Sequence, residues 1–311
     1  MADTFTDPTI EMGHRAALKS IARVVEETVT PTDPETALTV ISAQLREGSV
    51  MVMTGAGVST DSGIPDYRGP HGSLKRHRPM TYQEFLHDPD ALQRYWARAF
   101  VGWRVMDRAQ PNSTHRALVE LERRGLITGI VTQNVDGLHL AAGSKNVVML
   151  HGDMSHVVCL NCGHREKRAH FDQRTHALNP GYAESIRLDP TMVNPDGDVA
   201  LPQSAVARFH IAPSENCGAE KLKPDVTYFG EPVDKHRKEA AWEMYHDSRS
   251  LLIAGSSLAV MSGYRFTLEA VQDHKQITVI NGGPGRADPK ADVVWRTPVG
   301  PAFEALLERL S

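Results

Sequence analysis

Short apolar runs recur along the chain and alternate with stretches of helical periodicity. Runs of this length, bounded by Gly, Asn, Gln, His or Ser, are typical of strands buried on both faces. The runs cover residues 49–53, 126–132, 147–150, 250–255 and 276–281.

Two of the intervening stretches predict helices with clear ends. The first begins at Asp33 and Pro34, because Asp caps free N–H groups and Pro suits the first helical position, and it ends at Gly48. The second begins at Ser113 and ends at Gly125, with leucines spaced along one face. Strands alternating with helices indicate an α/β fold, a Rossmann-like parallel sheet with helices on both faces.

The stretch 153–223 departs from this rhythm, because it holds all three cysteines, many His and Pro, and no clear alternation. It predicts a small inserted module. The expected domains are an N-terminal arm (1–34), a discontinuous Rossmann-like domain (35–152 and 224–311) and the inserted module (153–223).

Composition excludes several classes of protein. The 311 residues are 41% apolar and 23% charged, as in a globular protein, and the formal net charge of −4 offers no basic field for nucleic acid. No run approaches the roughly 20 apolar residues of a membrane span. The first fifteen residues resemble neither a secretory signal nor a transit peptide. Three cysteines cannot all pair, so we expect a reducing compartment, the cytoplasm.

The sequence TGAGVSTDSGIPDYRG (54–69) follows the first apolar run. A glycine turn after a strand lets backbone N–H groups approach an anion, although an isolated GxG is equally often a turn without a ligand. Thr60 stands where a dehydrogenase fingerprint has its third glycine, and no strand with an acidic end follows about 20 residues on. The motif therefore disfavours a dehydrogenase.

Polar residues follow two further runs. TQNVDGLH (132–139) presents Gln133, Asn134 and Asp136, which suit a ribose and a carboxamide, while the alternative is an Asx-type turn. LHGD places His151 after the next run. A lone His is more often structural, but ligands bind at the carboxyl ends of parallel strands, which favours His151 as a general base.

Six segments in this order resemble the sirtuins, the NAD-dependent protein deacylases. They are GAGVSTDSGIPDYRG, TQNVDGLH, LHGD, KPDVTYFGE, GSSLAV and VINGGP, and the resemblance spans roughly residues 35–310. RYWARAFVGW (94–103) is similar to the class II branch, which includes a human mitochondrial member.

The resemblance implies the site residues. His151 corresponds to the catalytic base and Asn134 to a second catalytic residue. The NAD-binding residues that it implies are Gly55, Ala56, Gly57, Ile64, Asp66, Tyr67, Arg68, Gln133, Asn134, Val135, Asp136, Gly255, Ser256, Ser257, Asn281, Gly282, Gly283 and Val299.

The resemblance also implies the reaction and its partners. NAD is consumed, and the acyl group of a protein lysine is transferred to ADP-ribose, with release of nicotinamide. The acyl-lysine substrate is expected as an extended strand along 226–231 and 257–263. The alternatives are a mono-ADP-ribosyltransferase on the same fold and an idle NAD-binding scaffold, which would not need His151. The acyl group stays open, with Arg and His candidates near 68–78 for an acidic one.

Cys159 and Cys162 have the spacing of half a structural zinc site. In the zinc-ribbon-like module of sirtuins a second cysteine pair completes it. Here Cys217 corresponds to the last ligand, but Ser214 stands where its partner is expected. One Zn²⁺ held by the three cysteines, completed by His156, His164 or His210, is one expectation, and a metal-free module is the other.

Overall fold

A computed structural model describes residues 5–69, 72–75, 78–187, 193 and 196–311. The chain forms two compact units, each assembled from three segments. The larger unit contains Arg23–His71, Ala109–His151 and Val233–Ser311. The smaller unit contains Met1–Ala22, Gly72–Arg108 and Gly152–Pro232.

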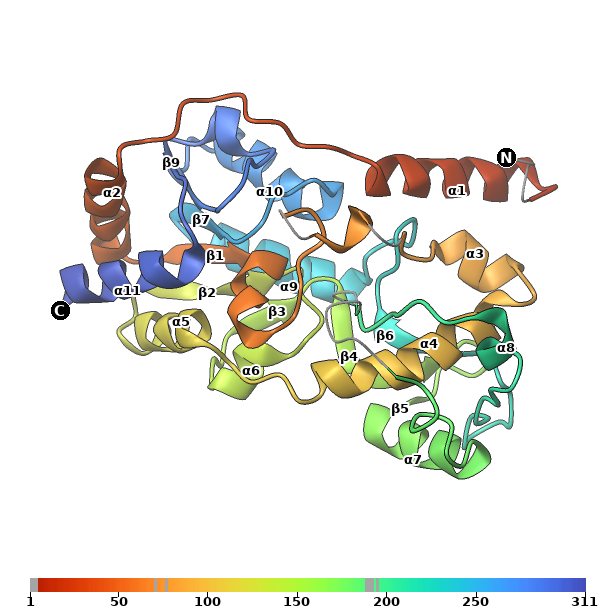
Figure 1. Ribbon diagram of the computed structural model, residues 1–311. Helices are drawn as coiled ribbons and strands as arrows, with labels where there is room; N and C mark the ends of the chain where they lie inside the picture. The colour runs from red at the N-terminus through yellow and green to blue at the C-terminus, as the bar shows by residue number, and fades with distance from the viewer. Residues whose placement is uncertain (1–4, 70–71, 76–77, 188–192, 194–195) are drawn as a thin grey trace. The chain divides into compact units, whose positions relative to one another are not determined.

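The larger unit is built on a six-stranded parallel sheet with the strand order β3-β2-β1-β7-β8-β9 (Figure 1). β1 and β7 lie at its centre, and the strand order changes direction there. The strands are β1 (Val50–Thr54), β2 (Ile127–Thr132), β3 (Val147–Met149), β7 (Ser250–Ala254), β8 (Ile277–Ile280) and β9 (Val293–Trp295).

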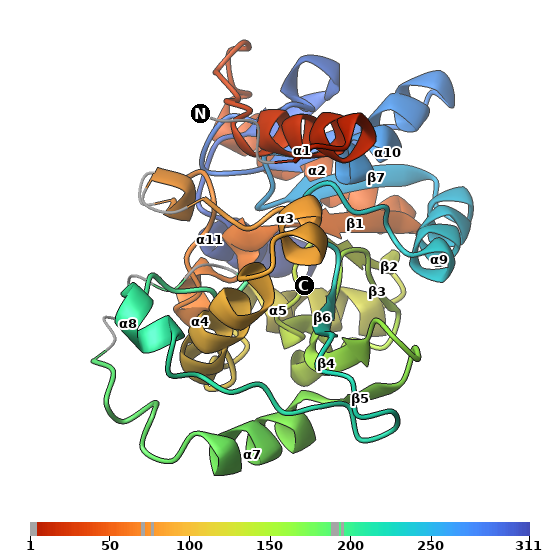
Figure 2. The same cartoon turned by 90° about the vertical axis from the view of Figure 1, so that its right-hand side faces the viewer.

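Helices cover both faces of this sheet, and the alternation of side chains along β1 explains why. Val50 and Val52 pack in a cluster with α2, α5 and α11, whereas Met51 and Met53 pack in another with α9 and α10. Helices lie on both faces of the sheet, as Figures 1 and 2 show. The helices are α2 (Pro34–Glu47), α5 (Ser113–Arg123), α6 (Leu138–Ala142), α9 (Lys235–His246), α10 (Met261–Gln272) and α11 (Val299–Leu310).

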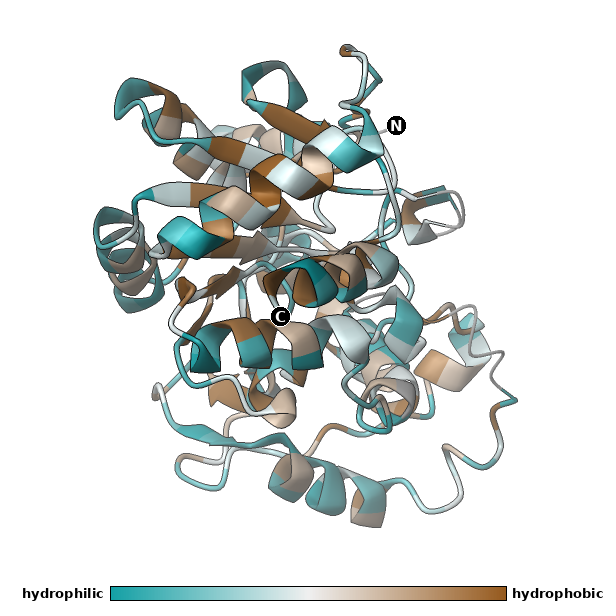
Figure 3. Cartoon of the chain, turned by 90° about the vertical axis from the view of Figure 1, so that its left-hand side faces the viewer, coloured by the Kyte–Doolittle hydropathy of each residue, from teal (hydrophilic) through white to brown (hydrophobic). Residues whose placement is uncertain are grey.

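The helix surfaces carry the complementary pattern. In Figure 3 the helices show apolar stretches in brown and polar stretches in teal. In α5 the buried residues include Ala117, Leu118 and Leu121, while Arg116 and Arg123 are exposed. This division is expected of helices that cover a sheet with one side only.

The smaller unit has a three-stranded antiparallel sheet with the order β5-β4-β6 and its own apolar core, in which Trp96, Phe171 and Phe209 are buried. Its elements are α1 (Pro8–Ile21), α3 (Tyr82–His87), α4 (Ala91–Met106), β4 (Gly152–Cys159), β5 (Arg165–Lys167), α7 (Arg168–Leu178), α8 (Gln203–Val206) and β6 (Leu222–Val226).

Short 3₁₀ turns occur in both units. They lie at Ala56–Val58, Thr60–Ser62 and Asp288–Lys290 in the larger unit and at Ser73–Lys75 in the smaller one.

The predicted parallel sheet and its two helical layers are confirmed. Asp33 caps α2 by accepting from the N–H of Thr36, and Gly48 ends the helix with φ +75°. The compact units also include a grouping that the strand–helix pattern did not indicate. Residues 72–108, which contain α3 and α4, lie in the same unit as 152–232.

Candidate active site and cysteine cluster

The glycine turn after β1 packs directly on the turn after β7. The Gly57 N–H donates to the Gly255 carbonyl oxygen at 2.8 Å, and the Gly55 N–H donates to the Ala254 carbonyl oxygen at 3.3 Å. A Cβ at Gly55 would lie 2.7 Å from the Cβ of Ser256, and Gly255 has φ +61°. The glycines therefore allow two loops to meet, and the N–H groups of Gly55 and Gly57 are already bonded within the protein.

A buried hydrogen-bond network joins this turn to the end of β2. The Ser59 hydroxyl donates to Asp136 Oδ2 at 2.7 Å, and the Leu138 N–H donates to Asp136 Oδ1 at 2.9 Å. The Asn134 amide donates to the Gly55 carbonyl and to the Ser59 hydroxyl, both at 3.1 Å. Burial raises the pKa of Asp136, against the lowering effect of these hydrogen bonds.

The imidazole of His151 is held at both nitrogens. Nδ1 lies 3.1 Å from the Gln133 carbonyl oxygen, which can only accept, so Nδ1 carries the proton. Nε2 is then the acceptor, and the Ser262 hydroxyl donates to it at 2.7 Å. The side chain is half-buried, and desolvation lowers the pKa of His151 to about 4 although the Gln133 carbonyl raises it.

Gln133 also connects these groups to the turn after β7. Its N–H donates to the Thr54 carbonyl at 2.9 Å, and its side-chain oxygen accepts from the Ser256 hydroxyl at 2.6 Å. The structure thus brings Gly55, Gln133, His151 and Ser256 together at the carboxyl edge of the sheet, as predicted for parallel strands.

The segment after the glycines lies at the same edge. Ile64 is buried and its N–H donates to the Ser59 carbonyl, while Asp66 accepts from the Gly69 N–H at 2.7 Å. Tyr67 and Arg68 are partly exposed, and burial lowers the pKa of Arg68. Of the cationic candidates near 68–78, positions 71 and 76–77 lie outside the described residues.

The predicted adenosine side follows β8. The Asn281 amide donates to the Gly283 carbonyl at 2.7 Å, and Arg296 donates to the same oxygen. No atom lies within 4 Å of a Cβ built on Gly283. The position beside Gly283 is therefore open. Val299 begins α11 and is buried.

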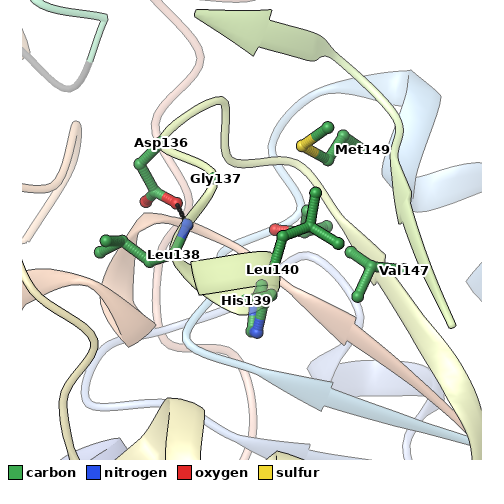
Figure 4. A pocket seen from close by; sticks show the side chains of 8 residues that line it. Asp136, Gly137, Leu138, His139, Leu140, Val147 and Met149 are labelled. Carbon is green, nitrogen blue, oxygen red and sulfur yellow. Dashed lines mark hydrogen bonds between the residues drawn. The ribbon is translucent and has the colours of Figure 1, made fainter. Parts of the chain in front are cut away.

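A small hollow opens beside Asp136 (Figure 4). Its lining is mostly apolar, and Asp136 is its one residue from the predicted site. The lining residues are Thr132, Asp136, Gly137, Leu138, His139, Leu140, Val147 and Met149.

The three cysteines cluster in the smaller unit, with every pair of sulfurs within 4.8 Å and none in a disulfide. Cys159 Sγ lies 3.6 Å from Cys217 Sγ, close to the separation of about 3.8 Å that two thiolates have on one tetrahedral zinc. Among the described residues no histidine joins this cluster, so the structure gives no support for His156, His164 or His210 as a ligand.

Two turns of the same shape form the cluster. In one, the Cys159 N–H donates to the His164 carbonyl and the Gly163 N–H to the Cys159 carbonyl. In the other, the Ser214 N–H donates to the Ala219 carbonyl and the Gly218 N–H to the Ser214 carbonyl. The two glycines have φ +73° and +72°. Ser214 thus takes the place of Cys159 in the second turn, and its Oγ lies 3.9 Å from Cys162 Sγ.

Sequence reasoning missed two hydroxyl groups of the site, those of Ser59 and Ser262. Ser59 lies inside the glycine motif, yet only the fold brings its hydroxyl to Asp136. Ser262 is far from His151 in the sequence, and no motif connected them.

The fold is α/β, and polar side chains converge at the carboxyl edge of its parallel sheet. Residues 55–262 match the Sir2 family model. NAD-dependent protein deacetylase 1 of Corynebacterium efficiens is 62% identical over 266 residues, 86% of this chain and 95% of that protein. The chain therefore belongs to the Sir2 family, the sirtuins.

Two further similarities extend this assignment. NAD-dependent protein deacylase Sirt4 of Drosophila melanogaster is 40% identical over 85% of this chain and 84% of its own, which is compatible with the class II branch. A Sir2 structure with a deacetylated p53 peptide and 3'-O-acetyl ADP ribose has a TM-score of 0.69 at 26% identity, over 88% of this chain and 98% of that one. In the part of the chain that the structure describes, we find no helix with the length and apolarity of a membrane span.

Proposed function

We propose that this sirtuin is an NAD-dependent protein-lysine deacylase that transfers the acyl group of a modified lysine to ADP-ribose. Family membership supports NAD as the co-substrate. The names of the relatives and the peptide and acetyl-ADP-ribose in related structures support a protein substrate.

The observation that carries the proposal is the state of His151. Its Nδ1–H is fixed on the Gln133 carbonyl, so its lone pair is on Nε2, and its lowered pKa keeps the imidazole neutral at pH 7. A neutral imidazole with an oriented lone pair is a general base. In this proposal Nε2 of His151 accepts the proton of a ribose hydroxyl. The hydroxyl oxygen then attacks the acyl carbon.

NAD supplies an N-glycosidic bond whose cleavage releases nicotinamide and opens the ribose to the acyl oxygen. Asn134 and Asp136, fixed by Ser59, are proposed to contact the ribose and nicotinamide. The open backbone at Gly283 and the nearby Asn281 suit the adenosine. The predicted site also includes Ala56, Val135, Ser257 and Gly282.

The test is a mass-spectrometric time course with NAD and peptides that carry acetyl, propionyl, longer and acidic acyl-lysines. We expect free lysine peptide, nicotinamide and O-acyl-ADP-ribose in equal amounts. His151→Ala should lower turnover by about 10²–10⁴-fold, the usual contribution of a general base. His236→Ala is the matched control, because its side chain is 90% exposed.

Three outcomes would overturn parts of this proposal. ADP-ribose attached to protein without peptide deacylation would favour the mono-ADP-ribosyltransferase. NAD binding without any turnover would favour the idle scaffold. Unchanged turnover in His151→Ala would remove the assigned base while leaving the activity.

We also propose that the smaller unit binds one structural Zn²⁺. Cys159, Cys162 and Cys217 would hold it as thiolates, and Ser214 or a water molecule would take the fourth position. The matching geometry of the two turns supports this. Metal analysis of purified protein should find one zinc per chain, and none would contradict the proposal.

A cytoplasmic location belongs to the same proposal. It is supported by the three unpaired thiols, which a reducing compartment preserves. Fractionation of cells that make the protein, with a periplasmic and a membrane marker as references, would test it.

A further inference from the structure

Ser262 contacts the nitrogen through which His151 would act as a base. It is the second residue of α10, and its hydroxyl lies 2.7 Å from Nε2. Because Nδ1 carries the proton, the hydroxyl is the donor and Nε2 the acceptor. The imidazole has one lone pair, so Nε2 accepts from only one hydroxyl at a time.

The segment that carries Ser262 is built around Gln133. The Ser256 hydroxyl donates to the Gln133 side chain at 2.6 Å and accepts from the Leu258 N–H at 3.2 Å. Leu258 has φ +46°, a conformation rarely adopted by a residue with a branched side chain. A Cβ on Gly263 would lie 2.7 Å from Gln133 Nε2. The packing therefore fixes Ser262 relative to the residue that holds the other imidazole nitrogen.

We propose that Ser262 is a positioning residue for His151, whose hydroxyl keeps the Nε2 lone pair oriented until a substrate hydroxyl replaces it. This proposal rests on the deacylase function. The ring then has its tautomer and rotation set before the substrate arrives, so less ordering is left for the reaction.

The exchange moves one proton. As the ribose hydroxyl takes the place of Ser262, its proton passes to Nε2 and its oxygen bonds to the acyl carbon. The C=N π bond between the acyl carbon and the lysine nitrogen breaks, and its electron pair moves to that nitrogen. The imidazole becomes a cation whose Nδ1–H still donates to Gln133. Ser262 keeps its own proton throughout, so it acts through His151 and not on the substrate.

The test compares Ser262→Ala and Ser262→Thr with wild type. Loss of one hydrogen bond should lower kcat about five- to tenfold in Ser262→Ala, with KM for NAD within about twofold, and Ser262→Thr should recover most of kcat. Ser204→Ala is the control, because Ser204 is also the second residue of a helix and is exposed. It should not change kcat.

A second readout follows the hydrogen bond itself. In protein with isotope-labelled histidine, the Nε2 NMR resonance of His151 should shift toward that of a free imidazole lone pair in Ser262→Ala, but not in Ser262→Thr. An unchanged resonance in Ser262→Ala, or a higher kcat, would overturn the proposal. Equal loss of kcat in both variants with an unchanged resonance would do the same. If wild type has no deacylase activity, the proposed function is wrong. The NMR comparison still shows whether the Ser262 hydroxyl donates to His151 Nε2.

Discussion

Gly57 and Gly255 meet backbone to backbone, with the N–H of Gly57 donating to the carbonyl oxygen of Gly255 at 2.8 Å. This contact joins the turns after two neighbouring strands. The glycines are therefore required by the packing of the protein on itself, before any ligand is considered.

Gly57→Ala should be destabilising. The new Cβ would lie 2.8 Å from the Gly255 oxygen and 2.9 Å from its Cα, so the two turns must separate. We expect a loss of about 1–3 kcal/mol in the free energy of unfolding, together with weaker NAD binding. Denaturant unfolding and calorimetry measure the two effects. Gly283→Ala, where the added methyl meets no atom within 4 Å, should leave stability unchanged, and an equal loss there would contradict the packing argument.

Ser59→Ala should weaken NAD binding more than it weakens the fold. It removes the hydroxyl that donates to Asp136, so the buried carboxylate loses a donor and the pKa of Asp136 rises further. We expect KM for NAD to rise about five- to thirtyfold, the effect of roughly 1–2 kcal/mol. Steady-state kinetics measures it. Ser59→Thr should restore NAD binding, because it keeps the hydroxyl. If NAD binding is not restored, its loss in Ser59→Ala comes from local packing and not from the missing hydroxyl.

Two buried histidines in the larger unit should make its stability depend on pH. The rings of His115 and His139 lie 4.8 Å apart, and desolvation lowers their pKa values to about 4 and about 3. In the unfolded chain these two imidazoles take up protons near pH 6.5, whereas in the folded protein they do not. Stability is therefore complete above pH 6.5 and falls as the pH drops toward 4, by about 2–3 kcal/mol for each histidine.

Unfolding in denaturant at pH 7 and at pH 5 measures this dependence. His139→Gln should reduce the difference in stability between the two pH values, because one of the histidines with a lowered pKa, which include His151, no longer titrates. His236→Gln, at an exposed position, should leave it as in wild type. A pH dependence that is identical in His139→Gln and wild type would show that other groups cause it.

Ser214→Cys should tighten zinc binding. Ser214 has the place in its turn that Cys159 has in the other, and a thiolate is a much better zinc ligand than a neutral hydroxyl. We expect an affinity at least about tenfold higher with the same stoichiometry of one. Competition with a chromophoric chelator measures it. Ser204→Cys adds an exposed thiol elsewhere and should leave the zinc affinity unchanged. If only the Ser214→Cys variant binds zinc and wild type does not, three thiolates are not enough to hold the ion.

The strands of the parallel sheet were predictable because buried central strands are apolar along their whole length. The run 250–255 corresponds to β7, and the run 126–132 to β2. The strand β9, Val293–Trp295, was not predicted, although β3, Val147–Met149, is equally short and was. The helices α3 and α4 gave no signal that they pack with 152–232, because that is decided by contacts distant in sequence.

The predicted site residues were found through their place after the strands and through family motifs. Ser59 and Ser262 could not be found in this way, because serine is common and its partner is set by tertiary structure. Ser214 was visible in the sequence as a departure, but its equivalence to Cys159 required the hydrogen bonds of the two turns.

The pairing of β1 with β7 also bears on the order in which the protein folds. Val50 pairs with Ser250 and Thr54 with Ala254, although these residues are far apart along the chain. Such non-local pairings form slowly and only after both strands exist. During synthesis the glycine turn cannot form its hydrogen bonds to Ala254 and Gly255 until residues 250–255 have left the ribosome, so it reaches its final form late.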